Sequence, residues 1–251
     1  MKRDNIDVLI LDAGRGRRLQ PITNIFPKCL LTVQGTTVLE RQIEQLSSFG
    51  LKRFTFCIGY KKKIIQQKLV CLSKKYNIKT FFKTNPHFSS TGTLFSLYLS
   101  LPKIKKNVIL INGDIVMDIN PIKELMEQIK RDKTTSIFII KEGEADQEAV
   151  RVLLSKKGMI KKISKKIELE VCKGEFTGIS YLSEKYVKQL KVLIPQLITN
   201  NRNEFYEYAV EKSIEIYGSR LKTILFKQAR FIEIDTYKDY LRAKHIFDGN
   251  R

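Results

Sequence analysis

The sequence predicts an α/β protein of the Rossmann-like, three-layer α/β/α class, with a mostly parallel mixed sheet and a small antiparallel insertion. Two patterns predict this class. Short apolar segments alternate with amphipathic segments over the first half of the chain, which is typical of parallel sheets covered by helices on both faces. From residue 142 the alternation is replaced by closely spaced short strands, which indicates the antiparallel insertion.

Apolar and β-branched runs predict the strands, and helical spacing of apolar residues predicts the helices between them. Strands are expected at residues 8–11, 53–58, 78–82, 107–111, 135–140, 176–182 and 231–234. Helices are expected at residues 37–49, 63–75, 120–131, 184–198 and 202–216, after the polar loop 85–93, and at the end of the chain to about Phe247. Short antiparallel strands are expected at residues 150–155, 158–164 and 167–170, with Lys157-Gly158 as a hairpin turn.

The length of 251 residues suits a single domain, residues 1–251, in which residues 142–175 form a β-rich lid. With 43% hydrophobic and 29% charged residues, the composition is that of a soluble globular protein. No apolar run reaches membrane-spanning length, and the N-terminal apolar stretch is too short for a signal peptide. The four cysteines lack metal-binding spacing. We therefore expect a cytoplasmic protein without an integral membrane segment.

The formal net charge of +20 permits binding to nucleic acid or to an anionic membrane surface, or steering of anionic substrates. Most lysines are scattered in small groups such as Lys61-Lys62-Lys63 and Lys165-Lys166, and a solvated surface explains each group. A basic stripe interleaved with aromatic residues is missing from the sequence. A nucleic-acid-binding protein is therefore the competing class, with only the charge in its favour.

The first predicted strand leads into a loop that suits a polyphosphate. Residues 12–18 contain Gly14, Gly16 and three arginines, and Pro27-Lys28 follows. Glycine lets the backbone approach a ligand, successive amides can form an anion-binding nest, and arginine matches phosphate oxygens. The dinucleotide fingerprint is excluded because a third glycine is missing, and a P-loop is excluded because Gly-Lys-Ser/Thr is missing. A tight turn beside surface arginines would explain the two glycines alone.

Two carboxylates follow strands elsewhere in the chain. Asp114 follows an apolar strand, and Asp235 follows an alternating strand and precedes a helix. Taken separately, Asp114 could be a turn residue and Asp235 a helix N-cap. Together their oxygen atoms suit Mg²⁺, which usually takes one or two carboxylates with phosphate oxygens and waters. The only histidines, His87 and His245, lie far apart in the sequence, which leaves little for a histidine-based nucleophilic triad.

These motifs together resemble the nucleotidyltransferases that make NDP-sugars and CDP-alcohols. The matching segments are Gly14-x-Gly16-x-Arg18-Leu19, Pro21-Ile22-Thr23, Pro27-Lys28, Asn112-Gly113-Asp114 and Glu233-Ile234-Asp235-Thr236. The resemblance implies the nucleotide-diphospho-sugar transferase fold. Asp12 departs from the family pattern, which usually has a small residue there. A carboxylate beside a phosphate loop must face away, bind metal, or meet the sugar or base.

The resemblance also implies a reaction and the residues that perform it. A phosphate or phosphonate oxygen of the acceptor attacks the α-phosphorus of an NTP, pyrophosphate leaves, and no general base is needed. The implied catalytic residues are Arg18, Lys28, Asp114 and Asp235, and the last two would bind Mg²⁺. The implied nucleotide-binding residues are Ala13, Gly14, Arg15, Gly16, Arg18, Thr91, Gly92 and Thr93.

A further segment resembles the branch of choline-phosphate, polyol-phosphate and phosphonate cytidylyltransferases. It is Gly174-Glu175-Phe176-Thr177-Gly178. The branch implies CTP and a small phosphorylated or phosphonylated alcohol, with Lys28, Glu175 and Gly178 at the acceptor. A surface position on an edge strand would also explain Glu175. The alternative is a sugar-1-phosphate nucleotidyltransferase using UTP, GTP or dTTP. We expect a monomer or homodimer that does not bind nucleic acid.

Overall fold

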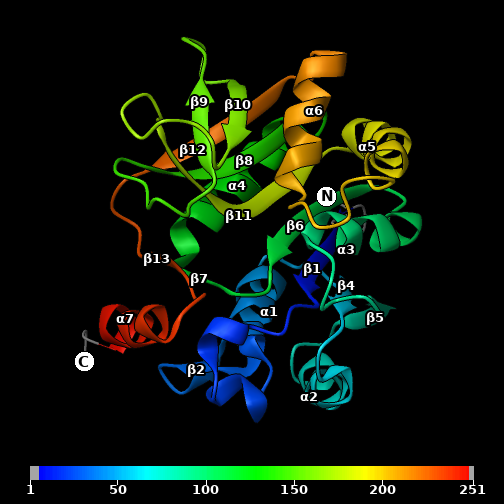
Figure 1. Ribbon diagram of the computed structural model, residues 1–251. Coiled ribbons are helices and arrows are strands. Elements are labelled where there is room, and N and C mark those ends of the chain that lie inside the picture. The colour runs from blue at the N-terminus through cyan, green and yellow to red at the C-terminus, as the bar shows by residue number, and fades with distance from the viewer. Residues whose placement is uncertain (1–5, 249–251) are drawn as a thin grey trace.

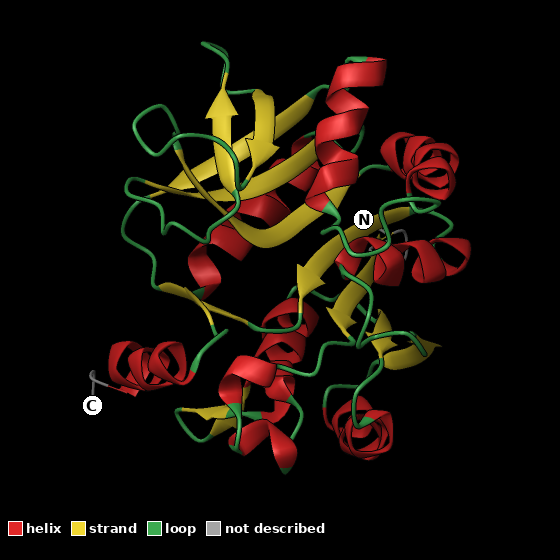
Figure 2. Cartoon of the chain, in the orientation of Figure 1, coloured by secondary structure: helices red, strands yellow, loops and turns green. Residues whose placement is uncertain are grey.

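The computed structural model describes residues 6–248 and shows a mixed central sheet with helices on both faces (Figures 1 and 2). The main strands are β1 Ile6–Asp12, β4 Arg53–Ile58, β5 Lys79–Thr84, β6 Asn107–Asn112, β8 Ser136–Glu142, β11 Gly174–Leu182 and β12 Leu221–Phe226. Parallel pairing joins β5, β4, β1 and β6, while β11 runs antiparallel to both β6 and β8, and β12 is parallel to β8. The predicted fold class is confirmed.

Each face of the sheet is covered by three helices. One face packs α1 Val38–Ser48, α2 Lys62–Lys75 and α4 Ile119–Arg131, and the other packs α3 Thr93–Ser100, α5 Glu184–Leu197 and α6 Glu207–Tyr217. All seven residues of β1 are buried, as expected for a central strand covered on both sides. None of the helices within residues 6–248 combines the length and apolar character needed to cross a membrane.

Helix α1 shows how the sequence produces these elements. The Thr37 side chain accepts a hydrogen bond from the amide of Glu40 at 3.2 Å and so caps the helix. Leu39, Ile43 and Leu46 recur at helical spacing and are fully buried against the sheet. Burial of this apolar stripe is the main contribution of the helix to stability, at about 1.5–3 kcal/mol for each fully buried leucine or isoleucine.

Smaller elements complete the fold around the ends of the strands. They are the hairpin β9 Arg151–Leu154 and β10 Ile160–Ser164, the pair β7 Ile115–Met117 and β13 Phe231–Glu233, the pair β2 Thr32–Val33 and β3 Thr36–Thr37, and helix α7 Tyr237–Asp248. Short 3₁₀ helices lie at Arg17–Leu19, Ile22–Asn24, Lys28–Leu30 and Leu101–Lys103. Leu19 of the first loop, Val116 of β7 and Phe247 of α7 share one small apolar cluster.

The structure corrects three sequence predictions. Residues 167–170 form no strand, because the chain turns there and its short alternation has no partner. Strand β12 was not predicted. Helix α6 begins at Glu207 rather than residue 202, because the carbonyls of Arg202 and Glu204 accept hydrogen bonds from Gly92 and Leu94 instead of from the next helical turn. The predicted domain limits at residues 1 and 251 lie outside the described residues.

Candidate active site

The candidate site forms where the neighbouring parallel strands β1 and β6 end. The Gly113 amide donates to the Leu11 carbonyl at 2.9 Å, which fixes the exit of β6 against β1. Directly beyond, β7 pairs with β13, and the Ile234 amide donates to the Asp114 carbonyl at 3.1 Å. This pairing brings Asp114 and Asp235 together. In open α/β sheets, ligands bind beyond the carboxyl ends of the strands, so the position agrees with a binding site.

Lys28 lies between the two carboxylates. Its Nζ atom donates to Asp114 Oδ2 at 2.7 Å and to Asp235 Oδ1 at 2.5 Å, and its side chain is only 11% exposed. Burial lowers the pKa of Lys28, but attraction to Asp114 and then Asp235 outweighs it, so the pKa is raised above the ordinary value. The ammonium group therefore stays charged at neutral pH.

Arg18 extends this chain of ion pairs toward solvent. Its guanidinium donates to Asp235 Oδ2 at 3.0 Å and to Glu148 Oε2 at 2.5 Å. Burial raises the pKa of Asp235, but the charges of Lys28 and Arg18 outweigh it, so the pKa is lowered. Glu148 was not predicted as a site residue. The contact joins the insertion to the phosphate loop.

Three carboxylates form a cluster that fits a divalent cation. Oxygen atoms of Asp114, Glu233 and Asp235 lie within 4.8 Å of one another. Asp114 Oδ1 is buried and has no hydrogen-bond partner within residues 6–248. This oxygen atom is therefore available to bind a cation. Glu233, two residues before Asp235, was not predicted as a metal ligand, although its carboxylate belongs to the cluster. Nearby protein and the negative charges of Asp114 and Asp235 raise the pKa of Glu233 above its ordinary value.

The glycine loop leaves several backbone donors free. Within the described chain, no hydrogen bond uses the amide of Gly14, Arg15 or Gly16. Gly16 has φ +64°, and the Thr23 hydroxyl donates to its carbonyl at 2.9 Å, which holds the turn. Such a turn with free amides matches an anion-binding nest. The Arg15 guanidinium lies 5.5 Å from the ring centre of Tyr60.

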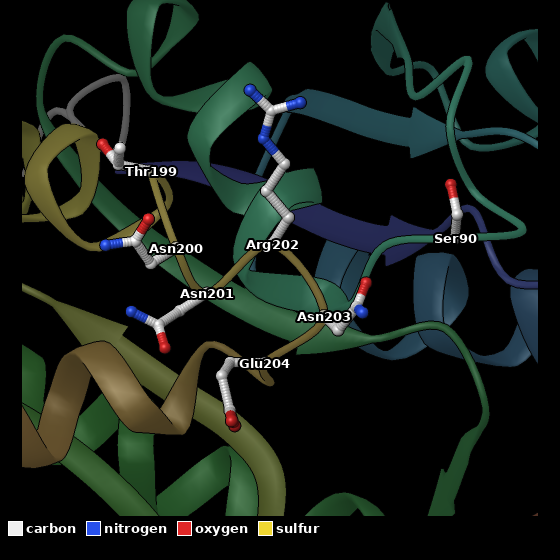
Figure 3. Close-up of a pocket in the computed structure, with 7 residues that line it drawn as sticks. All are labelled: Ser90, Thr199, Asn200, Asn201, Arg202, Asn203 and Glu204. Carbon is white, nitrogen blue, oxygen red and sulfur yellow. The ribbon is translucent and has the colours of Figure 1, made fainter.

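The predicted nucleotide-binding residues 91–93 contact the loop that precedes α6, of which Figure 3 shows residues 199–204. Thr91 Oγ1 accepts from Asn85, the Gly92 amide donates to the Arg202 carbonyl, and Thr93 Oγ1 accepts from the Tyr206 amide. A Cβ on Gly92 would lie 2.2 Å from the Glu204 carbonyl oxygen, so the contact requires glycine. A polar pocket of about 340 Å³, lined by Ser90 and residues 199–204, lies beside this contact. Their role in nucleotide binding stays a prediction.

The predicted acceptor residues lie on β11. Glu175 is buried, and its Oε1 accepts from Lys141 Nζ at 2.8 Å, so its charge is already paired. Gly178 has φ +73°, and a Cβ there would lie 2.8 Å from Asn112 Nδ2. This close approach packs β11 against the end of β6, two residues before Asp114. The acceptor-binding roles of Glu175 and Gly178 stay predictions.

Asp12, the departure from the family pattern, lies at the end of β1. A Cβ on Gly113 would lie 2.8 Å from Asp12 Oδ1, so the two residues are in close contact. Burial and the charge of Asp114 together raise the pKa of Asp12 to about 7, although a hydrogen bond with Cys29 opposes them. Asp12 thus packs against Gly113, the residue before Asp114.

Comparison with known families agrees with this geometry. The family model described as MobA-like NTP transferase domain matches residues 8–179. The chain belongs to this family. The match spans the glycine loop, Lys28 and Asp114, so the suspected membership in a nucleotidyltransferase family is confirmed.

Individual relatives show the breadth of the family. The chain is 26% identical over 236 residues to the bifunctional IPC transferase and DIPP synthase of Aquifex aeolicus, covering 94% of the chain and 50% of that protein. It is 25% identical over 212 residues to the choline-phosphate cytidylyltransferase of Streptococcus pneumoniae, covering 77% of the chain and 90% of that protein. The chain spans about half the length, or less, of the first curated relatives it matches.

A solved structure shows the same fold. The CTP:phosphocholine cytidylyltransferase of Streptococcus pneumoniae superposes with a TM-score of 0.77 at 20% identity, covering 96% of the chain and 99% of that structure. The mixed sheet and its two helical layers are therefore those of the nucleotide-diphospho-sugar transferase fold. The predicted nucleotide-diphospho-sugar transferase fold is therefore confirmed as well as the fold class.

Proposed function

We propose that this chain transfers CMP from CTP to a small phosphorylated or phosphonylated alcohol and releases pyrophosphate. The observation that carries the proposal is Lys28, buried between Asp114 and Asp235 beside the free amides of the glycine loop. A positive charge held between two carboxylates beside a phosphate-binding loop can stabilise the negative charge that shifts between phosphate groups during the reaction. The cytidylyltransferase relative is matched over 90% of its length, which favours this branch.

In the proposed reaction the protein mainly positions charged groups. The amides of residues 14–16 and the Arg18 guanidinium would bind the β- and γ-phosphates. Lys28 would hold the acceptor phosphate near the α-phosphorus. The acceptor oxygen forms a bond to the α-phosphorus while the bond to the β-phosphate oxygen breaks. The attacking phosphate is already an anion, so no residue has to remove a proton.

Asp114 and Asp235 are the residues that would hold Mg²⁺, with Glu233 beside them. A bound Mg²⁺ would neutralise charge on the α-phosphate and on the leaving pyrophosphate. Lys28 would keep the two carboxylates at a fixed separation and reduce their mutual repulsion.

We also propose that residues 142–175 act as a lid. The contact between Glu148 and Arg18 supports this, because it joins the segment directly to the phosphate loop. Both side chains are more than half exposed, so the ion pair costs little to break. A lid must open to admit substrates and close over them.

The second candidate function is a sugar-1-phosphate nucleotidyltransferase. It is favoured by the mannose-1-phosphate guanylyltransferase 1 of Arabidopsis thaliana, 26% identical over 189 residues, although the chain covers only 52% of that protein. The two candidates differ in nucleotide and acceptor rather than in the proposed site.

The test is a competition assay with purified protein, divalent cation, and equal CTP, UTP, GTP and ATP. The acceptor pool contains phosphocholine, phosphoethanolamine, aminoethylphosphonate, polyol phosphates and sugar 1-phosphates, and products are identified by mass. A dominant CDP-alcohol or CDP-phosphonate supports the proposal. A dominant UDP- or GDP-sugar supports the second candidate. Absence of pyrophosphate release with every pair contradicts both.

A further inference from the structure

Tyr60 is attached to the chain on both sides of the glycine loop, although it follows a different strand. It comes directly after β4, which pairs with β1 on the side away from β6. The Tyr60 amide donates to the Ala13 carbonyl at 3.0 Å, and the Tyr60 hydroxyl donates to the Thr23 carbonyl at 2.8 Å. One residue thus fixes the two ends of the segment that contains Gly14 and Gly16.

Thr23 carries this attachment to the centre of the loop. Its side chain is fully buried, and its hydroxyl donates to the Gly16 carbonyl at 2.9 Å. Gly16 has φ +64°, so the turn at this residue depends on its left-handed conformation. The hydrogen bonds from Tyr60 to Thr23 and from Thr23 to Gly16 therefore hold the turn whose amides are free to bind an anion.

Tyr60 also connects the glycine loop with the second predicted nucleotide-binding segment. The centre of its ring lies 5.9 Å from that of Phe88, which belongs to the loop leading to residues 91–93. A Cβ on Gly59 would lie 2.7 Å from the Ala13 carbonyl oxygen and 2.7 Å from Phe88 Cβ. The absence of a side chain at Gly59 therefore lets both loops approach the end of β4.

The Tyr60 ring faces two cations that lack carboxylate partners. The guanidinium carbon of Arg15 and the ammonium of Lys61 each lie 5.5 Å from its centre. Neither forms an ion pair within residues 6–248, whereas Arg18 is bound to two carboxylates. Arg15 Nε is buried and has no hydrogen-bond partner in the same part of the chain. An aromatic face can hold a guanidinium in place while its donors stay available to phosphate oxygens.

We propose that Tyr60 is a positioning residue for nucleotide binding. It holds the glycine loop in the conformation that leaves its amides free, and its ring presents Arg15 to the phosphates of the nucleotide. Tyr60 acts through the loop and through Arg15 and does not touch the reacting atoms. This inference rests on the proposed function in one respect, which is that a triphosphate binds at the glycine loop. It does not depend on the base or on the acceptor.

Two substitutions separate the hydroxyl from the ring. Tyr60→Phe removes only the hydrogen bond to the Thr23 carbonyl and should raise the KM for CTP by about 5-fold. Tyr60→Leu also removes the ring that faces Arg15 and should raise this KM by roughly 20-fold. The KM for the acceptor should stay unchanged in both variants, because the loop binds only the nucleotide. A merely structural role would instead change both KM values and kcat together.

Tyr76 provides the matched control. Its hydroxyl donates to Glu40 Oε1 at 3.3 Å, and the Lys75 ammonium lies 5.0 Å from the centre of its ring. It resembles Tyr60 in both contacts but follows the end of α2, whereas Tyr60 precedes the start of this helix. Tyr76→Phe and Tyr76→Leu should leave the KM for CTP unchanged.

A double-mutant cycle tests whether the ring acts through Arg15. Arg15→Ala should raise the KM for CTP by about 10-fold, because it removes a charged donor from the phosphates. In the Arg15→Ala chain, Tyr60→Leu and Tyr60→Phe should have the same effect, since no guanidinium remains for the ring to hold. A fully additive effect of Tyr60→Leu would contradict the action through Arg15.

Binding of inorganic tripolyphosphate separates this inference from the proposed function. Tripolyphosphate should raise the Tm of the wild-type chain more than that of Tyr60→Leu or Arg15→Ala. This difference without turnover of any nucleotide would contradict the proposed function and leave the inference standing. Normal turnover with unchanged CTP KM and unchanged tripolyphosphate binding in the Tyr60 variants would overturn the inference alone. If Tyr60→Leu does not fold, an unchanged KM for CTP in Tyr60→Phe would overturn it.

Discussion

Lys28 Nζ and Asp235 Oδ1 lie 2.5 Å apart, although one residue follows the first strand and the other follows the last. Asp114, from the middle of the chain, accepts from the same ammonium group at 2.7 Å. The charged centre is thus assembled from three distant segments by the pairing of β1 with β6 and of β7 with β13. Each segment can be tested separately.

Lys28→Ala should lower the single-turnover rate by about 10²–10³-fold with both substrates bound. The reason is that the substitution removes a fixed positive charge and leaves Asp114 and Asp235 to repel each other. Rapid-quench measurement at saturating substrates reports this rate directly. Lys130→Ala, on the exposed side of α4, is the control for loss of a lysine. An unchanged rate in Lys28→Ala would show that the ammonium has no part in the chemistry.

Arg18→Ala should act mainly on nucleotide binding. The guanidinium follows the glycine loop and is 51% exposed, so it is accessible to the outer phosphates. We expect the KM for CTP to rise by about 10-fold or more, since charge-assisted hydrogen bonds contribute about 1.5–3 kcal/mol. Steady-state kinetics should show a smaller change in kcat. A large fall in kcat with an unchanged KM would place Arg18 in the chemical step instead.

Activity should require a divalent cation, and Asp114→Asn should abolish it. The substitution removes a charge from the cluster that Asp114 forms with Glu233 and Asp235, within which oxygen atoms lie 4.8 Å or less apart. Activity is measured across a Mg²⁺ titration, with circular dichroism to verify folding. Glu124→Gln, exposed on α4, is the control. Full turnover of the wild-type chain in excess chelator would refute the metal assignment.

Asp12→Asn should make the chain less sensitive to alkaline pH. The folded-state pKa of Asp12 is raised from 3.8 to about 7, so between these values the folded chain binds more protons than the unfolded chain. The free energy of unfolding therefore falls as pH rises through this range. Relative to the wild type, Asp12→Asn should gain about 2 kcal/mol between pH 5 and pH 8. Urea unfolding at both pH values measures the gain, and a pH-independent difference would contradict the burial of this charge.

The sequence was sufficient to predict the sheet where strands are long, apolar and separated by strong turn signals. It was not sufficient for β12, whose residues Leu221–Phe226 include exposed and half-buried positions and follow no clear turn pattern. It also placed residues 202–206 in a helix, because their pairing with Gly92 and Leu94 depends on chain segments far away in the sequence.

The candidate site could be predicted only where its residues belong to local sequence motifs. Local motifs marked Arg18, Lys28, Asp114 and Asp235, and the structure brings all four together. Glu148 lies outside these motifs, and its contact with Arg18 depends on tertiary structure. Glu175 was predicted to lie at the acceptor, and this role stays a prediction. Its ion pair with Lys141, on the adjacent strand β8, depends on strand pairing that local motifs do not reveal.

The most direct test of the central claim follows the phosphate groups of CTP. The chain is incubated with an acceptor and with CTP labelled at either the α- or the γ-phosphorus. The account predicts that the α-label enters the acceptor product and that the γ-label leaves as pyrophosphate. Transfer of the γ-label to the acceptor, or its release as inorganic phosphate by the chain alone, would contradict nucleotidyl transfer at Lys28, Asp114 and Asp235.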